Sequence, residues 1–128
     1  MPVRFNIDID KRSIETTAAS RVTYTDLFEF YRSLRSHPNF ANDLCIIFDA
    51  TLAEGFDLDY DGVRRLSSVS DQFTKLDPPL RVAIIAPGDL AFGLSRMYET
   101  MKSASPGSVK VFRDRALAED WAFGRSAN

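Results

Sequence analysis

The chain has 128 residues, a formal net charge of −2 at pH 7 and one cysteine. A chain of this length can bury one core without disulfide bridges, so we expect a single domain over 1–128 with a frayed tail at 123–128. The longest apolar runs, at 44–48 and 82–86, are far shorter than the ~20 residues that cross a bilayer. We therefore expect no membrane span. Basic residues are scattered along the chain, so we expect no nucleic-acid partner. Cys45 lies in an apolar run, which favours a buried thiol in a reduced, cytoplasmic protein.

The first third of the chain contains signals for two strands and a helix. Apolar and polar residues alternate over 3–9, which predicts a strand with one buried face, and 13–20 can return beside it as a hairpin. Thr23 and Asp26 have the spacing of a capping box. We expect the helix that they begin to end at the His-Pro pair at 37–38, where the only histidine is a solvated helix-end residue.

Two apolar runs without alternation, at 44–48 and 80–86, are typical of inner parallel strands covered by helices on both faces. A helical stripe over 63–76 lies between these runs and ends at Asp-Pro-Pro. Another helix follows the second run. We expect its buried stripe to be Leu90, Leu94, Met97 and Met101.

The last third begins with a breaker-rich segment at 103–108, followed by a short strand at 109–112. Asp114 has the position of an N-cap for a final helix, on which Leu117 and Trp121 lie one turn apart. The complete order is β-β-α-β-α-β-α-β-α. It predicts an α/β domain with a mixed, mainly parallel sheet flanked by helices and joined by right-handed crossovers.

The segment GDLAFGLS at 88–95 has the glycine spacing of a nucleotide-binding P-loop, with Leu94 in place of the lysine. Since Leu90 has the helical phase of Leu94 and Met97, we expect the segment to be helical, with free amides only in its first turn. Asp89 in that turn would repel a phosphate. We therefore predict no nucleotide cofactor.

The segment DLDYDG at 57–62 matches the first half of an EF-hand loop, but Ser68 stands where the bidentate glutamate belongs. Asp59 or Asp61 capping a helix that begins near Gly62 is the simpler interpretation. The three aspartates Asp57, Asp59 and Asp61 remain weak candidates for a divalent ion. We predict no catalytic residue.

Phe92 is the best candidate for an interaction residue outside that segment. At about 100° per residue it lies about 160° from the middle of the predicted buried stripe, on the side of Arg96 and Glu99. Stacking beneath Arg96 is the alternative to a binding or dimer contact.

The chain resembles the SpoIIAA-like family of small bacterial STAS-fold domains. The resemblance covers most of residues 3–123 and rests on an F-G-x-x-R-M segment, a V-F-R-D strand and a helix with A-x-x-W. The matching positions are Phe92, Gly93, Arg96, Met97, Val111, Phe112, Arg113, Asp114, Ala118 and Trp121.

The resemblance implies a domain that works by binding a protein. STAS-type antagonists bind their partner at the start of a helix, where phosphorylation of D-S-S-G breaks the complex. The counterpart here is Asp59-Tyr60-Asp61-Gly62, which lacks both serines and so makes serine-kinase switching doubtful. We predict a regulatory protein-binding surface, for a partner or for self-association. It comprises 57–65, with Asp59, Tyr60, Asp61, Gly62 and Arg65, together with Phe92, Arg96 and Glu99.

Two other functions remain open. The resemblance to lipid-carrying domains leaves a small apolar ligand, which would need an internal cavity of about 300 Å³ or more. A metal-dependent enzyme built on the aspartates is the third alternative.

Overall fold

The computed structural model describes residues 2–102 and 107–124. Its strands form one sheet, in which β1 and β2 are antiparallel and all later neighbours are parallel, in the sequential order β1-β2-β3-β4-β5. The predicted order of elements and the predicted hairpin are therefore confirmed. The elements are β1 (Val3–Asp8), β2 (Ser13–Thr23), α1 (Tyr24–Ser36), β3 (Cys45–Asp57), α2 (Tyr60–Thr74), β4 (Arg81–Ile85), α3 (Asp89–Met101), β5 (Val109–Phe112) and α4 (Arg115–Ala122).

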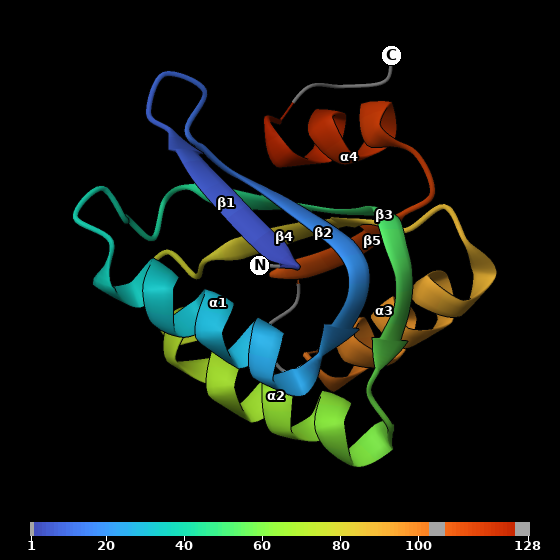
Figure 1. Ribbon diagram of the computed structural model, residues 1–128. Coiled ribbons are helices and arrows are strands. Elements are labelled where there is room, and N and C mark those ends of the chain that lie inside the picture. Colours follow the sequence, from blue (N-terminus) through green and yellow to red (C-terminus); the bar gives the residue numbers. More distant parts are fainter. Residues whose placement is uncertain (1, 103–106, 125–128) are drawn as a thin grey trace.

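The helices lie in two unequal layers (Figure 1). Helices α1, α2 and α3 cover one face of the sheet, and α4 covers the other. This follows from the strand order, because each parallel crossover advances by one strand in the same direction. Right-handed crossovers of that kind place their helices on the same face. Only α4, which follows the last strand, is free to cross to the opposite face.

The sheet separates two apolar clusters. The larger one joins the sheet to α1, α2 and α3, with Ile14, Leu34 and Ile46 fully buried. The smaller one lies under α4 and contains Cys45, as predicted, in a free and buried state. Burial raises the pKa of this thiol to about 11, so the side chain behaves as a small apolar residue.

β2 and β3 are longer than predicted. They continue as a parallel pair to Thr23 and Asp57, with register shifts between Thr17 and Ala19 and between Ser20 and Arg21. Figure 1 shows both strands curling past the rest of the sheet towards the starts of α1 and α2. This extension brings the apolar end of β3 over the helices, and it is what positions the site described below.

The buried face of α3 is predicted correctly only in part. Leu90 was expected to be buried but is 69% exposed, whereas Tyr98 is the buried residue of α3. Leu94, Met97 and Met101 are partly buried against the larger core, as predicted, and Ala91, Ser95 and Tyr98, spaced i, i+4 and i+7, extend the packed face.

On α4 the predicted cap Asp114 is confirmed, since its carboxylate accepts from the amide of Leu117 at 3.0 Å. On this helix Leu117 is 51% exposed, Ala118 and Ala122 are buried, and Trp121 packs against the smaller apolar cluster. Of the predicted break at 103–108 and tail at 123–128, residues 103–106 and 125–128 lie outside the described residues.

Candidate partner-binding surface

Helices α1 and α2 begin together at the end of the extended β2–β3 pair, which we call the convergent edge. β2 and β3 run as a parallel pair to Thr23 and Asp57, and each is followed directly by a helix, whereas β4 ends at Ile85, opposite Asp49, so α3 begins nearer the body of the sheet. The N-caps are Thr23, Asp59 and Gly88, of which Thr23 forms the predicted capping box with Asp26. The convergent edge carries the segment 57–65, so the main predicted surface lies where the N-termini of α1 and α2 meet.

Each predicted aspartate at the start of α2 is engaged within the chain. Asp57 forms an ion pair with Arg21, whose hydrogen bond and positive charge lower the pKa of the Asp57 carboxyl. Asp59 accepts from the amide of Gly62 at 2.8 Å and thus caps the helix, as predicted. Asp61 lies 3.4 Å from the guanidinium of Arg64.

These contacts bear on the predicted metal site. Asp57, Asp59 and Asp61 do not converge, and among residues 2–102 and 107–124 there is no group of three or more potential ligands that could hold a metal ion. The three carboxylates instead hold the end of β3 and the first turn of α2 in place. The geometry thus gives the metal-dependent alternative no support.

The aromatic side chains at this edge are the exposed Tyr60 and Phe28 and the half-buried Tyr24. Tyr60, in the first turn of α2, is 62% exposed. On α1, the rings of Tyr24 and Phe28 stack with centroids 6.2 Å apart, and the guanidinium of Arg65 lies 4.5 Å from the centre of the Tyr24 ring. We call Tyr24, Phe28, Tyr60 and Arg65 the α1–α2 aromatic patch.

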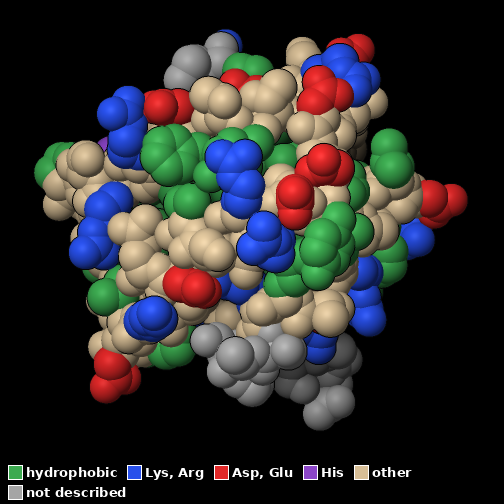
Figure 2. All heavy atoms as spheres, turned by 90° about the horizontal axis from the view of Figure 1, so that it is seen from below, with side chains coloured by type: hydrophobic (Ala, Val, Ile, Leu, Met, Phe, Trp, Pro, Cys, Tyr) green, Lys and Arg blue, Asp and Glu red, His purple; other side chains and the backbone are tan. Residues whose placement is uncertain are grey.

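On the helix-covered face of the molecule, the described residues form no large region of one charge (Figure 2). Figure 2 shows Lys and Arg side chains interspersed with acidic and apolar ones on this side. Mixed charges of this kind favour recognition by shape and specific contacts over long-range attraction of a highly charged partner.

Gly62 lets the chain fold tightly at the start of α2. A Cβ atom at this position would come within 2.9 Å of the Leu58 side chain. Leu58 lies over the helix start and contributes to the apolar cavity behind it. Gly62 therefore allows the Leu58 side chain to pack against the start of α2 and to line the cavity behind it.

The segment 88–95 is helical, as predicted, and offers no open phosphate loop. Helix α3 begins at Asp89, and the amide of Phe92 already donates to the carbonyl of Gly88 at 2.9 Å. The carboxylate of Asp89 pairs with Arg113 at 2.7 Å. The P-loop interpretation therefore fails on backbone geometry as well as on residue type.

Phe92 differs from its predicted environment. It is half-buried against the larger core, and its ring faces Arg113, whose guanidinium carbon lies 4.0 Å from the ring centre. Arg96 is exposed and instead approaches Glu99 at 3.9 Å. The predicted stacking of Phe92 under Arg96 is thus wrong, because the guanidinium that lies over the Phe92 ring belongs to Arg113.

The predicted site residues form two groups. Those at the start of α2 belong to the convergent edge, whereas Phe92, Arg96 and Glu99 share a side of α3 turned about 100° from the side that lines the cavity next to α2. The sequence analysis missed Tyr24 and Phe28. Their i, i+4 spacing beside the buried stripe of α1 is the signal that could have found them.

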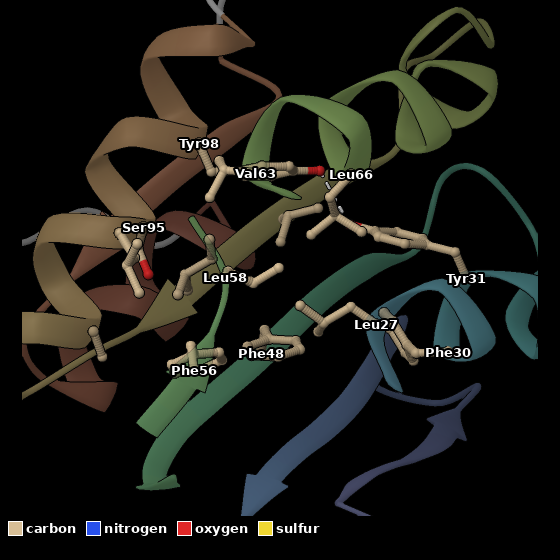
Figure 3. Close-up of a pocket in the computed structure, with 14 residues that line it drawn as sticks. Leu27, Phe30, Tyr31, Phe48, Phe56, Leu58, Val63, Leu66, Ser95 and Tyr98 are labelled. Carbon is tan, nitrogen blue, oxygen red and sulfur yellow. Dashed lines mark hydrogen bonds between the residues drawn. The ribbon is translucent and has the colours of Figure 1, made fainter. Parts of the chain in front are cut away.

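An apolar cavity of about 70 Å³ lies behind the convergent edge, between the sheet and helices α1, α2 and α3. In Figure 3, Phe48, Phe56, Leu58 and Leu27 point into this space, and Ser95 approaches it from α3. Drug-sized ligands occupy pockets of about 300 to 1,000 Å³. The cavity as it stands fits only a small apolar group.

A chain of buried hydroxyls borders the cavity. The Tyr31 and Tyr98 hydroxyls are 3.1 Å apart, and the Ser70 hydroxyl lies 2.6 Å from that of Tyr98. Burial raises the pKa of both tyrosines, well above the usual value for Tyr31. These groups connect α1, α2 and α3 through one polar network within an apolar interior.

Comparisons with known proteins identify the fold. A crystal structure of an uncharacterised protein of the DUF3478 family from Shewanella loihica PV-4, described as having a SpoIIAA-like fold, superposes with a TM-score of 0.60 at 22% sequence identity. The match covers 94% of this chain and 93% of that one. The chain has a SpoIIAA-like fold. No family model and no curated protein matches the sequence.

The SpoIIAA-like fold and the observed order of elements confirm the predicted α/β class with a mainly parallel sheet. Within the described residues, no helix combines the length and apolar character that a membrane span requires. The function of this SpoIIAA-like domain has to be argued from its surface.

Proposed function

We propose that this STAS-like domain is not an enzyme and acts in regulation by binding a protein partner at the convergent edge. The α1–α2 aromatic patch forms the centre of the contact. Around it, the ionisable groups Asp57, Asp59 and Asp61 hold the backbone in one conformation. A surface whose polar groups are already fixed loses little conformational entropy on binding.

The observation that carries the proposal is Tyr60. It is a large aromatic side chain, 62% exposed, on the first turn of a well-capped helix. Aromatic and arginine side chains dominate the binding energy of protein interfaces, and Arg65 with its stacked Tyr24 supplies the second such group. The exposed Tyr60 and the stacked Tyr24–Arg65 pair are therefore the residue types expected at the centre of an interface.

The chemistry at the start of α2 supports binding without a serine-phosphate switch. Tyr60 and Asp61 stand where the resemblance would require serines. Asp61 carries a permanent charge that is already paired with Arg64. We therefore propose a surface that is ready to bind without prior modification.

The test is quantitative affinity capture from native cell extract, with the wild-type chain and Tyr60→Ala and Arg65→Ala variants as bait. Arg96→Ala serves as the matched control, because Arg96 is an exposed arginine on α3. We expect at least one protein to be retained by the wild type and the control and lost from both patch variants. Titration calorimetry with that protein should then show a loss of ~2 kcal/mol or more for Tyr60→Ala, which is about 30-fold in Kd.

Capture of the same proteins by all four baits would contradict the proposal. So would a partner that is lost only with Arg96→Ala, since this result would move the interface to the outer side of α3. Thermal unfolding of every bait is needed to show that the variants are folded.

A second candidate function is binding of a small apolar ligand. It is favoured by the cavity of about 70 Å³, which is lined almost entirely by apolar side chains and bordered by the Tyr31 and Tyr98 hydroxyls. Binding of a larger ligand would require α3 to move away from α2. Native mass spectrometry of the purified chain tests this function, and a bound small molecule that disappears in Ser95→Leu would support it. A Ser95→Leu chain that is more stable and carries the same mass as the wild type would favour a simple packing gap.

A further inference from the structure

The outer edge of β1 has a set of backbone groups with no partner strand among the described residues. Within residues 2–102 and 107–124, β1 ends the sheet and pairs with β2 alone (Figure 1). The amide of Ala19 donates to the carbonyl of Pro2 at 2.8 Å, and antiparallel hydrogen-bonded pairs recur at every second residue. The even-numbered residues of β1 therefore bond to β2, while the N–H and C=O groups of Phe5 and Ile7 point outwards.

The side chains of β1 give this edge a self-complementary charge pattern. Arg4, Asn6 and Asp8 share one face of the strand, with the positive charge near its start and the negative charge near its end. Arg4 and Asn6 are exposed, and Asp8 is half-buried. A second β1 running antiparallel would bring each end against the opposite charge.

We propose that two copies of the chain pair through β1 in an antiparallel arrangement, with Asn6 opposite Asn6 of the second copy. Phe5 then forms a hydrogen-bonded pair with Ile7 of the second copy, which uses the outward N–H and C=O groups. Arg4 lies opposite Asp8 of the second copy, in the closer, non-hydrogen-bonded type of pair. By symmetry both contacts occur twice.

The charges select this register over its neighbours. Outward-facing N–H and C=O groups occur at every second residue, so the register of the two β1 strands can change only in steps of two residues. One shift places Arg4 opposite Asn6, and the other places Asn6 opposite Asp8 and moves Arg4 beyond the end of the second strand. Only the register centred on Asn6 pairs both charges.

The opposite face of β1 supplies apolar contact. Phe5 and Ile7 are half-buried, with the Phe5 ring packed edge-on against Phe30 at 5.5 Å and His37 at 5.7 Å. In the dimer each Phe5 would also cover Ile7 of the second copy, beneath one continuous sheet. The inference goes beyond the proposed function, because no residue of the α1–α2 aromatic patch takes part and the two copies would carry two such patches.

Sedimentation equilibrium of the wild-type chain from about 10 µM to about 1 mM tests the pairing, since a short strand edge is expected to give a Kd in that range. We expect the average mass to rise from monomer to dimer. Hydrogen exchange by NMR should show the Phe5 and Ile7 amides becoming protected as the concentration rises, while the Arg4 and Asn6 amides are protected throughout. A monomer at every concentration would overturn the proposal.

Charge reversal tests the register. Arg4→Asp and Asp8→Arg each place like charges opposite each other and should weaken the dimer by about tenfold or more. The double variant restores opposite charges and should return to within about threefold of the wild type. Because it contains both substitutions, its recovery also shows that Asp8→Arg does not act by unfolding the turn that Asp8 holds through the Lys11 amide.

Arg64→Asp, which makes the same charge change on α2, is the control and should leave the dimer unchanged. A dimer that is insensitive to both single reversals, or one that the double variant fails to restore, would show that another surface joins the copies.

Discussion

The guanidinium carbon of Arg65 lies 4.5 Å from the centre of the Tyr24 ring, and this contact joins the second turn of α2 to the first turn of α1. The two helices follow different strands, so their starts meet only because β2 and β3 extend to the same edge of the sheet. The pair thus orders the surface that we propose for partner binding.

We expect Arg65→Ala to lower the free energy of unfolding by about 0.5 to 1 kcal/mol, the usual size of an exposed cation–π contact. Arg65→Lys should lose less, since it retains a cation near the ring. Urea titration of both variants, combined with Tyr24→Leu in a double-mutant cycle, measures the coupling. Additive effects of Arg65→Ala and Tyr24→Leu would show that the contact contributes nothing to stability.

A second prediction separates the two aspartates at the start of α2. Asp59→Ala removes the N-cap that accepts from Gly62 and should cost about 1 kcal/mol. Asp61→Ala removes only an exposed pair with Arg64 at 3.4 Å and should cost about 0.5 kcal/mol or less. Thermal unfolding under identical conditions compares them, and an equal or larger loss for Asp61→Ala would contradict the assigned roles.

The order of elements could be predicted from the sequence because it depends on local patterns. Alternation over β1, the capping box at Thr23 and the cap at Asp114 all act within a few residues. The ends of β2 and β3 could not be predicted in this way. Polar residues such as Glu54 and Asp57 lie within β3 because β2 and β3 continue as a parallel pair beyond the rest of the sheet. The site depends on this long-range pairing.

The helix after β4 was predicted correctly, but one of the residues used to predict it, Leu90, does not lie on its buried face. Leu90 is 69% exposed although its helical phase predicts burial, and Ala91, Ser95 and Tyr98 join the partly buried Leu94, Met97 and Met101 in the packed face. Side-chain size alone does not define a buried face when small residues provide the close contact. The environment of Phe92 was also predicted wrongly, because its partner Arg113 directly follows β5 and comes from a different part of the sequence.

The α2–α3 contact contains a buried lysine with a testable role. The Lys102 side chain is 3% exposed, and its ammonium donates to the carbonyl of Ser67 at 2.7 Å and to Asp71 at 2.5 Å. Asp71→Ala would leave this cation with one acceptor fewer inside the protein. We expect a loss of about 1.5 to 3 kcal/mol in the free energy of unfolding by urea, several times that of Asp61→Ala. Similar losses for the two variants would show that Lys102 finds water instead.

The hydroxyl network around Tyr98 predicts how stability depends on alkaline pH. Burial raises the pKa of Tyr31 and Tyr98 in the folded chain above the value of about 10 in the unfolded chain. The folded state therefore holds these protons more tightly, so the stabilisation is complete below about pH 10 and is lost as the pH rises through the folded-state values. Urea titrations between about pH 8 and pH 11 should show a falling free energy of unfolding above about pH 10.

Tyr98→Phe isolates the network from general alkaline effects. The substitution removes the hydroxyl that lies 2.6 Å from Ser70 and 3.1 Å from Tyr31, and should cost about 1 to 3 kcal/mol at neutral pH because the Tyr31 hydroxyl loses its partner. It also removes one of the two tyrosines whose pKa burial raises, so the fall in stability above about pH 10 should become shallower. The exposed Tyr60→Phe is the matched control and should change neither quantity. A wild-type slope that persists in Tyr98→Phe would place the alkaline loss on other groups and leave Tyr98 with a packing role alone.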